Sequence, residues 1–213
     1  MRLVTAVALA SGMMAGAVHA EELDDVNAAF FATYPWECNG AFQEDGKPFE
    51  EPAVYDLPYR MSWQEPDEPD RTLRLYQYQC LIGAYNVGHV FFTVTEDGIR
   101  ALQLAQPTIS TIYAPGAEEG EVNDQKVEQI LLTGMTTYVT ASNAEVDAAT
   151  GTIKSTSFWR GIGDASSAAE WRLVDGDFSL VRFDVDASYD GEVNPTTIWD
   201  TTEALASAAA HRK

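Results

Sequence analysis

The chain has 213 residues with 13 Lys or Arg and 33 Asp or Glu, and therefore a formal charge of −20. A potential of that sign repels nucleic acid and anionic lipid head groups, so nucleic-acid binding is excluded, whereas cationic proteins are attracted. The same charge also keeps an exported protein soluble without any partner, and both interpretations stay open.

The first twenty residues have the pattern of a signal peptide. A single charge at Arg2 precedes an apolar, small-residue run over 3–17, and residues 18–20 (Val-His-Ala) end it before an acidic stretch. We expect cleavage after Ala20 and a mature protein, 21–213, that is periplasmic or secreted without stable membrane insertion. An uncleaved membrane anchor is the alternative.

The two cysteines predict one disulfide bond. Cys38 and Cys80 form an even pair in a chain that is expected in an oxidising compartment. Their wide spacing differs from the Cys-x-x-Cys of redox catalysts. Two buried, unpaired thiols are the alternative.

The N-terminal third of the mature chain combines one helix with an irregular region. Residues 22–33 carry apolar side chains near helical spacing with acids in the first turn, which predicts a short helix before Pro35. Pro, Glu and Asp are frequent over 36–69, where we predict loops and one edge-like strand at 54–63.

Strand signals are regular from residue 73 onward. Three turn pairs, each ending in Gly, predict hairpins over 89–104, 146–158 and 170–183. The segment 127–140 is predicted as one long strand or as two strands that break at Gly134. Residues 201–212 favour a helix or a disordered tail.

These elements predict a mainly β fold, either an antiparallel sandwich or a partly closed barrel. We expect a single β-rich domain over 21–213, or two β subdomains with a boundary near 114–125.

Two segments carry a family resemblance. The first is Cys80-Leu-Ile-Gly-Ala-Tyr-Asn86. The second consists of Thr150-Gly-Thr-Ile153, Arg160-Gly-Ile-Gly-Asp164, Trp171, Gly176, Phe178 and Leu180, and then Gly191, Pro195 and Trp199. In this order they resemble an exported proteobacterial family, domain of unknown function 1176, over residues 76–199. The resemblance implies an envelope location and a compact β-rich fold, and it implies no activity.

The chain departs from that family at a pair of cysteines. The family usually has Cys directly after the Gly-Asp pair and again before the later Gly, where this chain has Ala165 and either Tyr189 or Asp190. A disulfide that the resemblance would imply is therefore missing, and we expect packing to hold this region.

Four residues are candidates for contacting a ligand. Tyr85 and Asn86 lie on a turn that Cys80 would pin, where they present a ring and an amide; alternatively, Asn86 occupies a positive-φ turn and Tyr85 packs below it. Asp164 and Trp171 are the other two candidates. In their structural interpretation, Asp164 accepts hydrogen bonds in a Gly-rich turn and Trp171 pairs with an aromatic residue across strands.

Catalytic and metal-binding patterns are weak. His89 and His211 are the histidines left after cleavage, which argues against a Ser-His-Asp hydrolase and a zinc site, and His89 is predicted to be a half-buried, hydrogen-bonded residue. The stretch 184–192 alternates oxygen side chains, but Tyr189 and Pro195 stand where a calcium loop needs Gly and Glu, so an acidic turn is favoured. No metal or cofactor is predicted.

The sequence therefore favours a non-enzymatic binding or accessory module, with a cationic envelope protein as its partner. The alternative function is that of an envelope glycan hydrolase that uses paired carboxylates, although 33 acidic residues select no particular pair.

Overall fold

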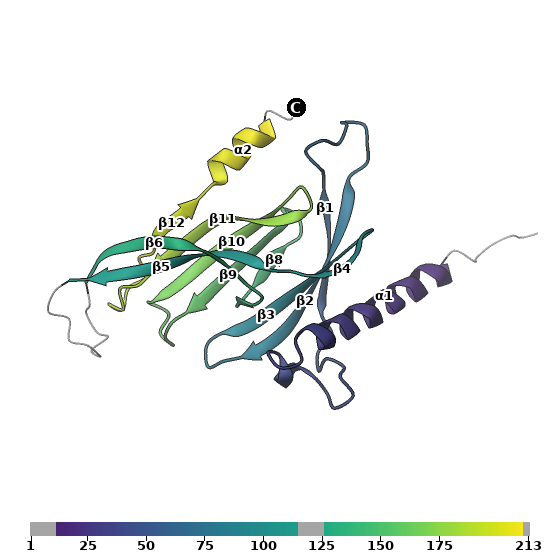
Figure 1. Cartoon of the computed structure of the whole chain (residues 1–213), viewed down its shortest axis with the longest axis horizontal. Helices are drawn as coiled ribbons and strands as arrows, with labels where there is room; N and C mark the ends of the chain where they lie inside the picture. Colours follow the sequence, from purple (N-terminus) through teal and green to yellow (C-terminus); the bar gives the residue numbers. More distant parts are fainter. Residues whose placement is uncertain (1–11, 115–125, 211–213) are drawn as a thin grey trace, which may run out of the picture.

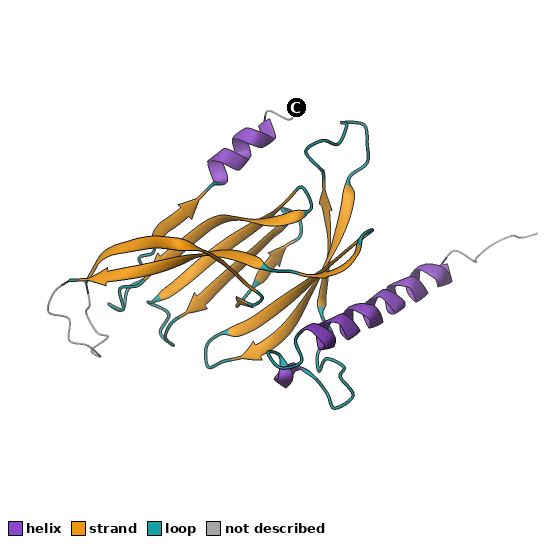
Figure 2. Cartoon of the chain, viewed as in Figure 1, coloured by secondary structure: helices purple, strands orange, loops and turns teal. Residues whose placement is uncertain are grey.

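A helix, two antiparallel sheets and a long hairpin make up the architecture (Figures 1 and 2), seen in a computed structural model that describes residues 12–114 and 126–210. The elements in chain order are α1 (Gly12–Thr33), the 3-10 helix η1 (Asn39–Ala41), β1 (Ala53–Tyr59), β2 (Arg71–Ile82), β3 (Val87–Thr95), β4 (Gly98–Ala101), β5 (Leu104–Tyr113), β6 (Val127–Tyr138), β7 (Ala141–Ser142), β8 (Glu145–Asp147), β9 (Thr152–Phe158), β10 (Ser166–Val174), β11 (Asp177–Asp186), β12 (Thr196–Asp200) and α2 (Thr202–Ala210).

The strands form two five-stranded sheets. The first has the order β1-β2-β3-β4, with β7 paired to β3, and the second has the order β12-β11-β10-β9-β8. Strands β5 and β6 pair with each other as a long hairpin beside the second sheet. The prediction of a mainly β fold with antiparallel sheets is confirmed, and the described strands form no closed barrel.

Strand β2 is buried on both faces because it lies between two layers. Leu73 and Leu75 point into the cluster between the sheets, whereas Tyr76 and Tyr78 point into a second cluster against α1. Alternate residues of a strand face opposite sides, so this Leu-x-Leu-Tyr-x-Tyr pattern produces two cores from one strand.

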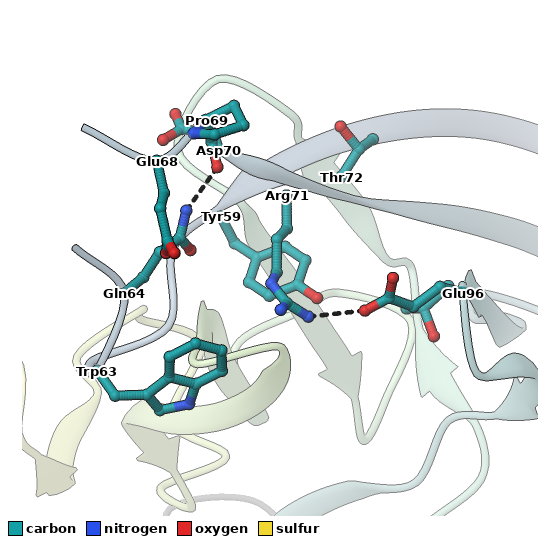
Figure 3. A pocket seen from close by; sticks show the side chains of 10 residues that line it. Tyr59, Trp63, Gln64, Glu68, Pro69, Asp70, Arg71, Thr72 and Glu96 are labelled. Atoms are coloured by element: carbon teal, nitrogen blue, oxygen red, sulfur yellow. Dashed lines mark hydrogen bonds and ion pairs between the residues drawn. The ribbon is translucent and has the colours of Figure 1, made fainter. Parts of the chain in front are cut away.

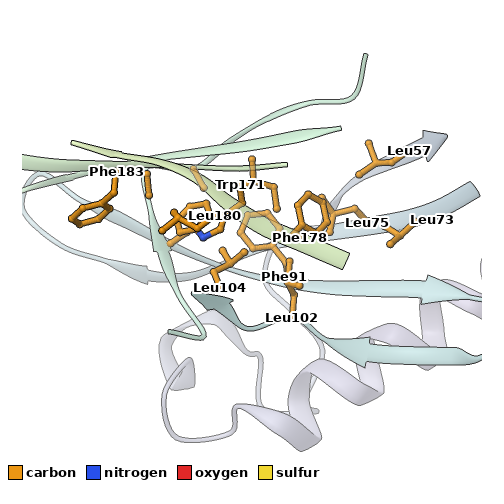
Figure 4. Close-up of a cluster of buried hydrophobic side chains, with 14 of the residues drawn as sticks. Leu57, Leu73, Leu75, Phe91, Leu102, Leu104, Trp171, Phe178, Leu180 and Phe183 are labelled. Atoms are coloured by element: carbon orange, nitrogen blue, oxygen red, sulfur yellow. The ribbon is translucent and has the colours of Figure 1, made fainter. Parts of the chain in front are cut away.

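The larger cluster joins the two sheets (Figure 4). Residues on both sides of the segment 115–125 contribute to it, and burial of their apolar surface is the main contribution to stability here. Its largest members are Leu57, Leu73, Leu75, Phe91, Leu102, Leu104, Ile153, Trp171, Phe178, Leu180, Phe183 and Val185.

Helix α1 packs on the opposite face of the first sheet. Val26 and Phe30, one helical turn apart, are fully buried, and the Phe30 ring lies 4.2 Å from that of Tyr78. Glu22 Oε1 accepts hydrogen bonds from the hydroxyl of Tyr76 and, at 2.9 Å, from the guanidinium of Arg74. These polar contacts fix the rotation of α1 on the sheet.

The predicted helix at 22–33 forms, but it begins ten residues earlier, at Gly12. Ala and Met are frequent between 12 and 20, and both residues favour the helix, so the pattern continues through the predicted cleavage position. Most of the predicted signal segment, residues 1–11, lies outside the described residues, and cleavage after Ala20 stays a prediction.

All three predicted hairpins are confirmed, as the pairs β3–β4, β8–β9 and β10–β11. Asp175 and Gly176 both have positive φ, 52° and 86°, as a tight two-residue hairpin turn requires. Strand β6 is one long strand with a shift in register at its centre, near Gly134. The C-terminal segment adopts the helical alternative, as α2.

Cys38 and Cys80 form the predicted disulfide bond. Cys38 follows α1, and Cys80 lies near the end of β2, so the bond joins the helix layer to the first sheet beside the second hydrophobic cluster. In the two described ranges, no helix combines the length and the hydropathy that crossing a bilayer requires.

Candidate functional site

The candidate site is a cavity at the end of the first sheet, where the β1–β2 loop folds over the start of β2 (Figure 3). It has a volume of about 390 Å³ and is lined by Tyr59, Trp63, Arg71 and Glu96, together with acidic residues of the loop. In the close-up, the Arg71 side chain reaches toward Glu96, and the Trp63 indole faces the cavity from the loop. Three separate segments therefore meet here.

Arg60 holds the β1–β2 loop in shape. Its guanidinium donates to the carbonyl oxygens of Glu65 and Glu68, at 2.6 and 2.8 Å, and to the carboxylate of Asp70 at 2.7 Å. One side chain thus fixes three points of the loop 60–70, which joins β1 to β2. A loop that is ordered before binding loses less entropy when a ligand arrives, so the site is preorganised.

Trp63 is the most distinctive residue of the cavity. Its side chain is 62% exposed, whereas Trp171, in the core between the sheets, is fully buried. The Arg71 guanidinium lies 5.2 Å from the centre of the Trp63 ring and donates to Glu96 at 2.8 Å. The cavity thus already holds one guanidinium between an aromatic face and a carboxylate, which is a cation–π arrangement.

Acidic groups outnumber basic groups around the cavity. Glu68, Asp70 and Glu96 line it, against Arg71 as its single basic side chain. Asp70 is 54% exposed and Glu96 is 75% exposed, so both carboxylates face solvent beside their arginine partners. The local field therefore has the same sign as that of the whole chain and favours a positively charged ligand.

Tyr59 connects this cavity to two others. It also lines cavities of about 490 and 260 Å³, which extend to the β3–β4 and β10–β11 turns and to α2. A Cβ added at Gly176 would lie 3.2 Å from the Tyr59 ring, so the glycine permits the β10–β11 turn to approach that ring closely. The three cavities at this end together are thus wider than the binding of a single ligand side chain requires.

Tyr85 and Asn86 lie at the opposite end of the first sheet. The Asn86 amide donates to the carbonyl oxygen of Phe158 at 2.8 Å and accepts from the Phe158 N–H at 3.0 Å, as a strand residue would. The Tyr85 hydroxyl donates to the Trp159 carbonyl at 3.3 Å, and its ring is 44% exposed. The two segments that carry the family resemblance therefore meet in space.

Asp164 lies in the same region and is almost completely buried. Arg160 binds both of its carboxylate oxygens, and the Gly191 N–H donates to Oδ2 at 2.8 Å. The hydrogen bonds from Arg160 hold the pKa of Asp164 well below its usual range, and the Gly191 N–H adds to this effect. Asp164 thus joins the loop after β9 to the loop after β11.

The lowered pKa of Asp164 predicts a loss of stability in acid. The unfolded chain takes up this proton before the folded chain does, so the charged carboxylate stabilises the fold above the ordinary Asp pKa, and this contribution falls as the pH drops toward the folded-state value. We expect the melting temperature of the wild type to fall more steeply below about pH 4 than that of Asp164→Asn.

Thermal denaturation at a series of acidic pH values measures both slopes. Asp67→Asn, a change at an exposed loop carboxylate, is the matched control and should retain the wild-type slope. Parallel slopes for the wild type and Asp164→Asn would contradict this role of Asp164.

Trp171 is separated from the other three candidate residues. It is fully buried between the sheets, and its indole N–H donates to the carbonyl oxygen of Ala105 at 2.6 Å. Tyr85, Asn86 and Asp164 thus lie around one group of loops, whereas Trp171 lies in the core. Each of the four has a hydrogen-bond partner within the protein. Ligand contact by any of them stays a prediction.

His89 and the acidic stretch 184–192 have structural partners. The His89 imidazole accepts from the Ala144 N–H at 3.4 Å, and burial lowers the pKa of His89, which agrees with the predicted half-buried histidine. Asp186 accepts from the backbone and hydroxyl of Ser188 and from the Asn194 N–H, as in a turn. Among the described residues, no group of three or more His, Cys, Asp or Glu side chains could hold a metal ion.

The sequence interpretation missed the cavity beside Trp63. Residues 54–63 were predicted as one strand, but β1 ends at Tyr59 because Arg60 anchors the loop that follows. A tryptophan in a Pro- and acid-rich loop is the signal that could have identified this site, since such loops rarely bury a large ring.

Scans against protein-family models, curated proteins and solved structures found no match to this chain. The resemblance to the family of unknown function stays a prediction that rests on the motifs of residues 76–199.

Proposed function

We propose that the chain is exported and acts as a non-enzymatic binding module, and that it holds a cationic envelope protein at the cavity beside Trp63. The observation that carries this proposal is the position of Arg71, between the Trp63 ring at 5.2 Å and Glu96 at 2.8 Å. The chain's own guanidinium occupies the kind of site that an arginine or lysine of a partner needs.

The charge distribution supports a protein partner rather than a small cation. A chain of charge −20 attracts a basic protein over a distance, and the cavities that meet at Tyr59 offer a surface wider than one side chain. The loop with Trp63 supplies a rigid aromatic anchor, the residue type that most often dominates the binding energy of protein interfaces.

The cavity suits glycan hydrolysis less well. A general acid must keep its proton near neutral pH, which requires burial away from positive charge. Asp70 and Glu96 are instead exposed, and each contacts an arginine. The hydrolase alternative predicts that the wild type releases reducing ends from envelope glycan and that Glu96→Gln does not. If the wild type releases none, the hydrolase alternative is ruled out.

Binding of a basic protein should depend strongly on salt and on Trp63. With a lysozyme as the cationic probe, we expect the affinity measured by calorimetry to fall steeply as sodium chloride rises. Trp63→Ala should weaken binding by a factor of roughly 30, because it removes the aromatic anchor. An acidic protein of similar size should show no binding.

Trp36→Ala is the matched control, since Trp36 is 83% exposed but lies just after α1 and outside the cavity. It should retain wild-type affinity. Affinity that does not change with salt, or equal effects of the two tryptophan substitutions, would refute the proposal. Capture of basic envelope proteins by the wild type, but not by Trp63→Ala, would extend it to the natural partner.

A further inference from the structure

The inner face of the second sheet changes character along its strands. Near the β10–β11 turn it carries large apolar residues, Ile153 and Trp171, which are paired across β9 and β10. Toward the other end the same face carries Ser155 opposite Ala169 and Ser157 opposite Ser167. Small side chains cannot fill the space that large ones fill, so a gap remains between this face and the elements that cover it.

That gap is a cavity of about 310 Å³. The β5–β6 hairpin contributes Gln106 and Tyr138 to its wall, and the segment that follows contributes Thr140 and Ser142. Phe183 of β11, which is almost fully buried, is also part of the lining. The volume lies at the small end of the range for pockets that bind small molecules.

No residue that lines this cavity carries a charge. This is a departure from a chain in which 22% of residues are charged, and it gives the cavity no means of selecting an ion. Hydroxyl groups dominate the lining instead, and they can both donate and accept hydrogen bonds.

Most of these polar groups are available to a ligand. Ser155 donates to the Ser142 carbonyl at 2.8 Å. In the described part of the chain, the side chains of Gln106, Tyr138, Ser157 and Ser167 make no hydrogen bond to another protein group. Four polar groups that converge on one uncharged cavity predict a ligand with several neutral hydroxyls.

We propose that this cavity binds one sugar ring of a neutral saccharide. The hydroxyls of Ser157 and Ser167 and the amide of Gln106 hydrogen-bond the sugar hydroxyls, and the Tyr138 and Phe183 rings contact its apolar C–H groups. The cavity lies between the hairpin and the second sheet, whereas the Trp63 cavity lies at the end of the first sheet, so the two proposals are independent.

Titration calorimetry with glucose, galactose, N-acetylglucosamine and their β-linked disaccharides tests the proposal. We expect saturable binding of at least one of them with a Kd of about 1 mM or below, and little change in Kd between low and high salt, because no charge is involved. Glucuronic acid should bind more weakly than glucose, since its carboxylate finds no cation in the lining.

The Ser157→Ala/Ser167→Ala double variant should weaken this binding about tenfold or more by removing two hydrogen bonds. Ser179→Ala, at an exposed position of β11, is the matched control and should bind as the wild type does. Circular dichroism and thermal denaturation establish that each variant is folded.

Two results would overturn the proposal. The first is the absence of saturable binding for every saccharide of the panel to folded wild-type protein, which would leave a water-filled gap. The second is equal affinity in the double variant and in Ser179→Ala. Neither result depends on the cationic partner, because Trp63→Ala should leave saccharide binding unchanged.

Discussion

Replacing Trp171 by Ala is expected to lower the free energy of unfolding by about 3–5 kcal/mol. The side chain is 0% exposed and lies in the cluster between the sheets. Its truncation opens a cavity there and also removes the indole N–H that donates to the Ala105 carbonyl at 2.6 Å. Urea denaturation followed by far-UV circular dichroism measures the loss, with the slope of the transition as a check on two-state behaviour.

Two further variants separate the causes of this loss. Trp171→Phe keeps most of the ring but removes the indole N–H, so about 1–3 kcal/mol should be lost. Trp36→Ala removes an indole that is 83% exposed and should change stability by about 0.5 kcal/mol or less. If Trp171→Ala were no more destabilising than Trp36→Ala, the cluster between the sheets would not be the main core.

Local turn chemistry made the hairpins predictable. The pair Asp175-Gly176 needs positive φ at both positions, and residues that tolerate this conformation are few, so the sequence itself marks the turn. The apolar Leu and Tyr residues at alternate positions on both faces of β2 likewise indicate that both faces are buried. Such features depend on neighbours in the chain, and sequence patterns report them directly.

The candidate site was not predictable in the same way. Trp63, Arg71 and Glu96 belong to a loop, a strand start and a turn, and their meeting depends on how β1, β2 and β3 pair. The cavity between the β5–β6 hairpin and the second sheet depends similarly on the register that places Ser157 opposite Ser167. Both cavities arise from tertiary contacts, and the local propensity of a segment does not report which distant segments it contacts.

The start of α1 was predicted at the wrong residue. Apolar spacing and an acidic first turn predict a helix over 22–33, whereas α1 already includes Gly12, the first residue that the structure describes. Three alanines and two methionines over 12–20 favour the helix, so it continues across the predicted cleavage position.

Loss of the disulfide between Cys38 and Cys80 is expected to lower the free energy of unfolding by about 4 kcal/mol. The bond spans 42 positions, and closing a loop of that size in the unfolded chain removes much of its conformational entropy. Urea denaturation of the wild type with and without a reducing agent measures the change. The Cys38→Ala/Cys80→Ala variant should match the reduced wild type and should not respond to the reductant.

The same experiment distinguishes stability from binding. Arg71 and Cys80 lie near opposite ends of β2, about 30 Å apart at the rise of an extended strand. Arg60, and not the disulfide, orders the loop that carries Trp63. We therefore expect the cysteine-free variant, while folded, to bind the cationic probe with the wild-type Kd. An unchanged free energy of unfolding after reduction would contradict the first expectation, and a weakened Kd in the folded variant would show that the bond positions the site.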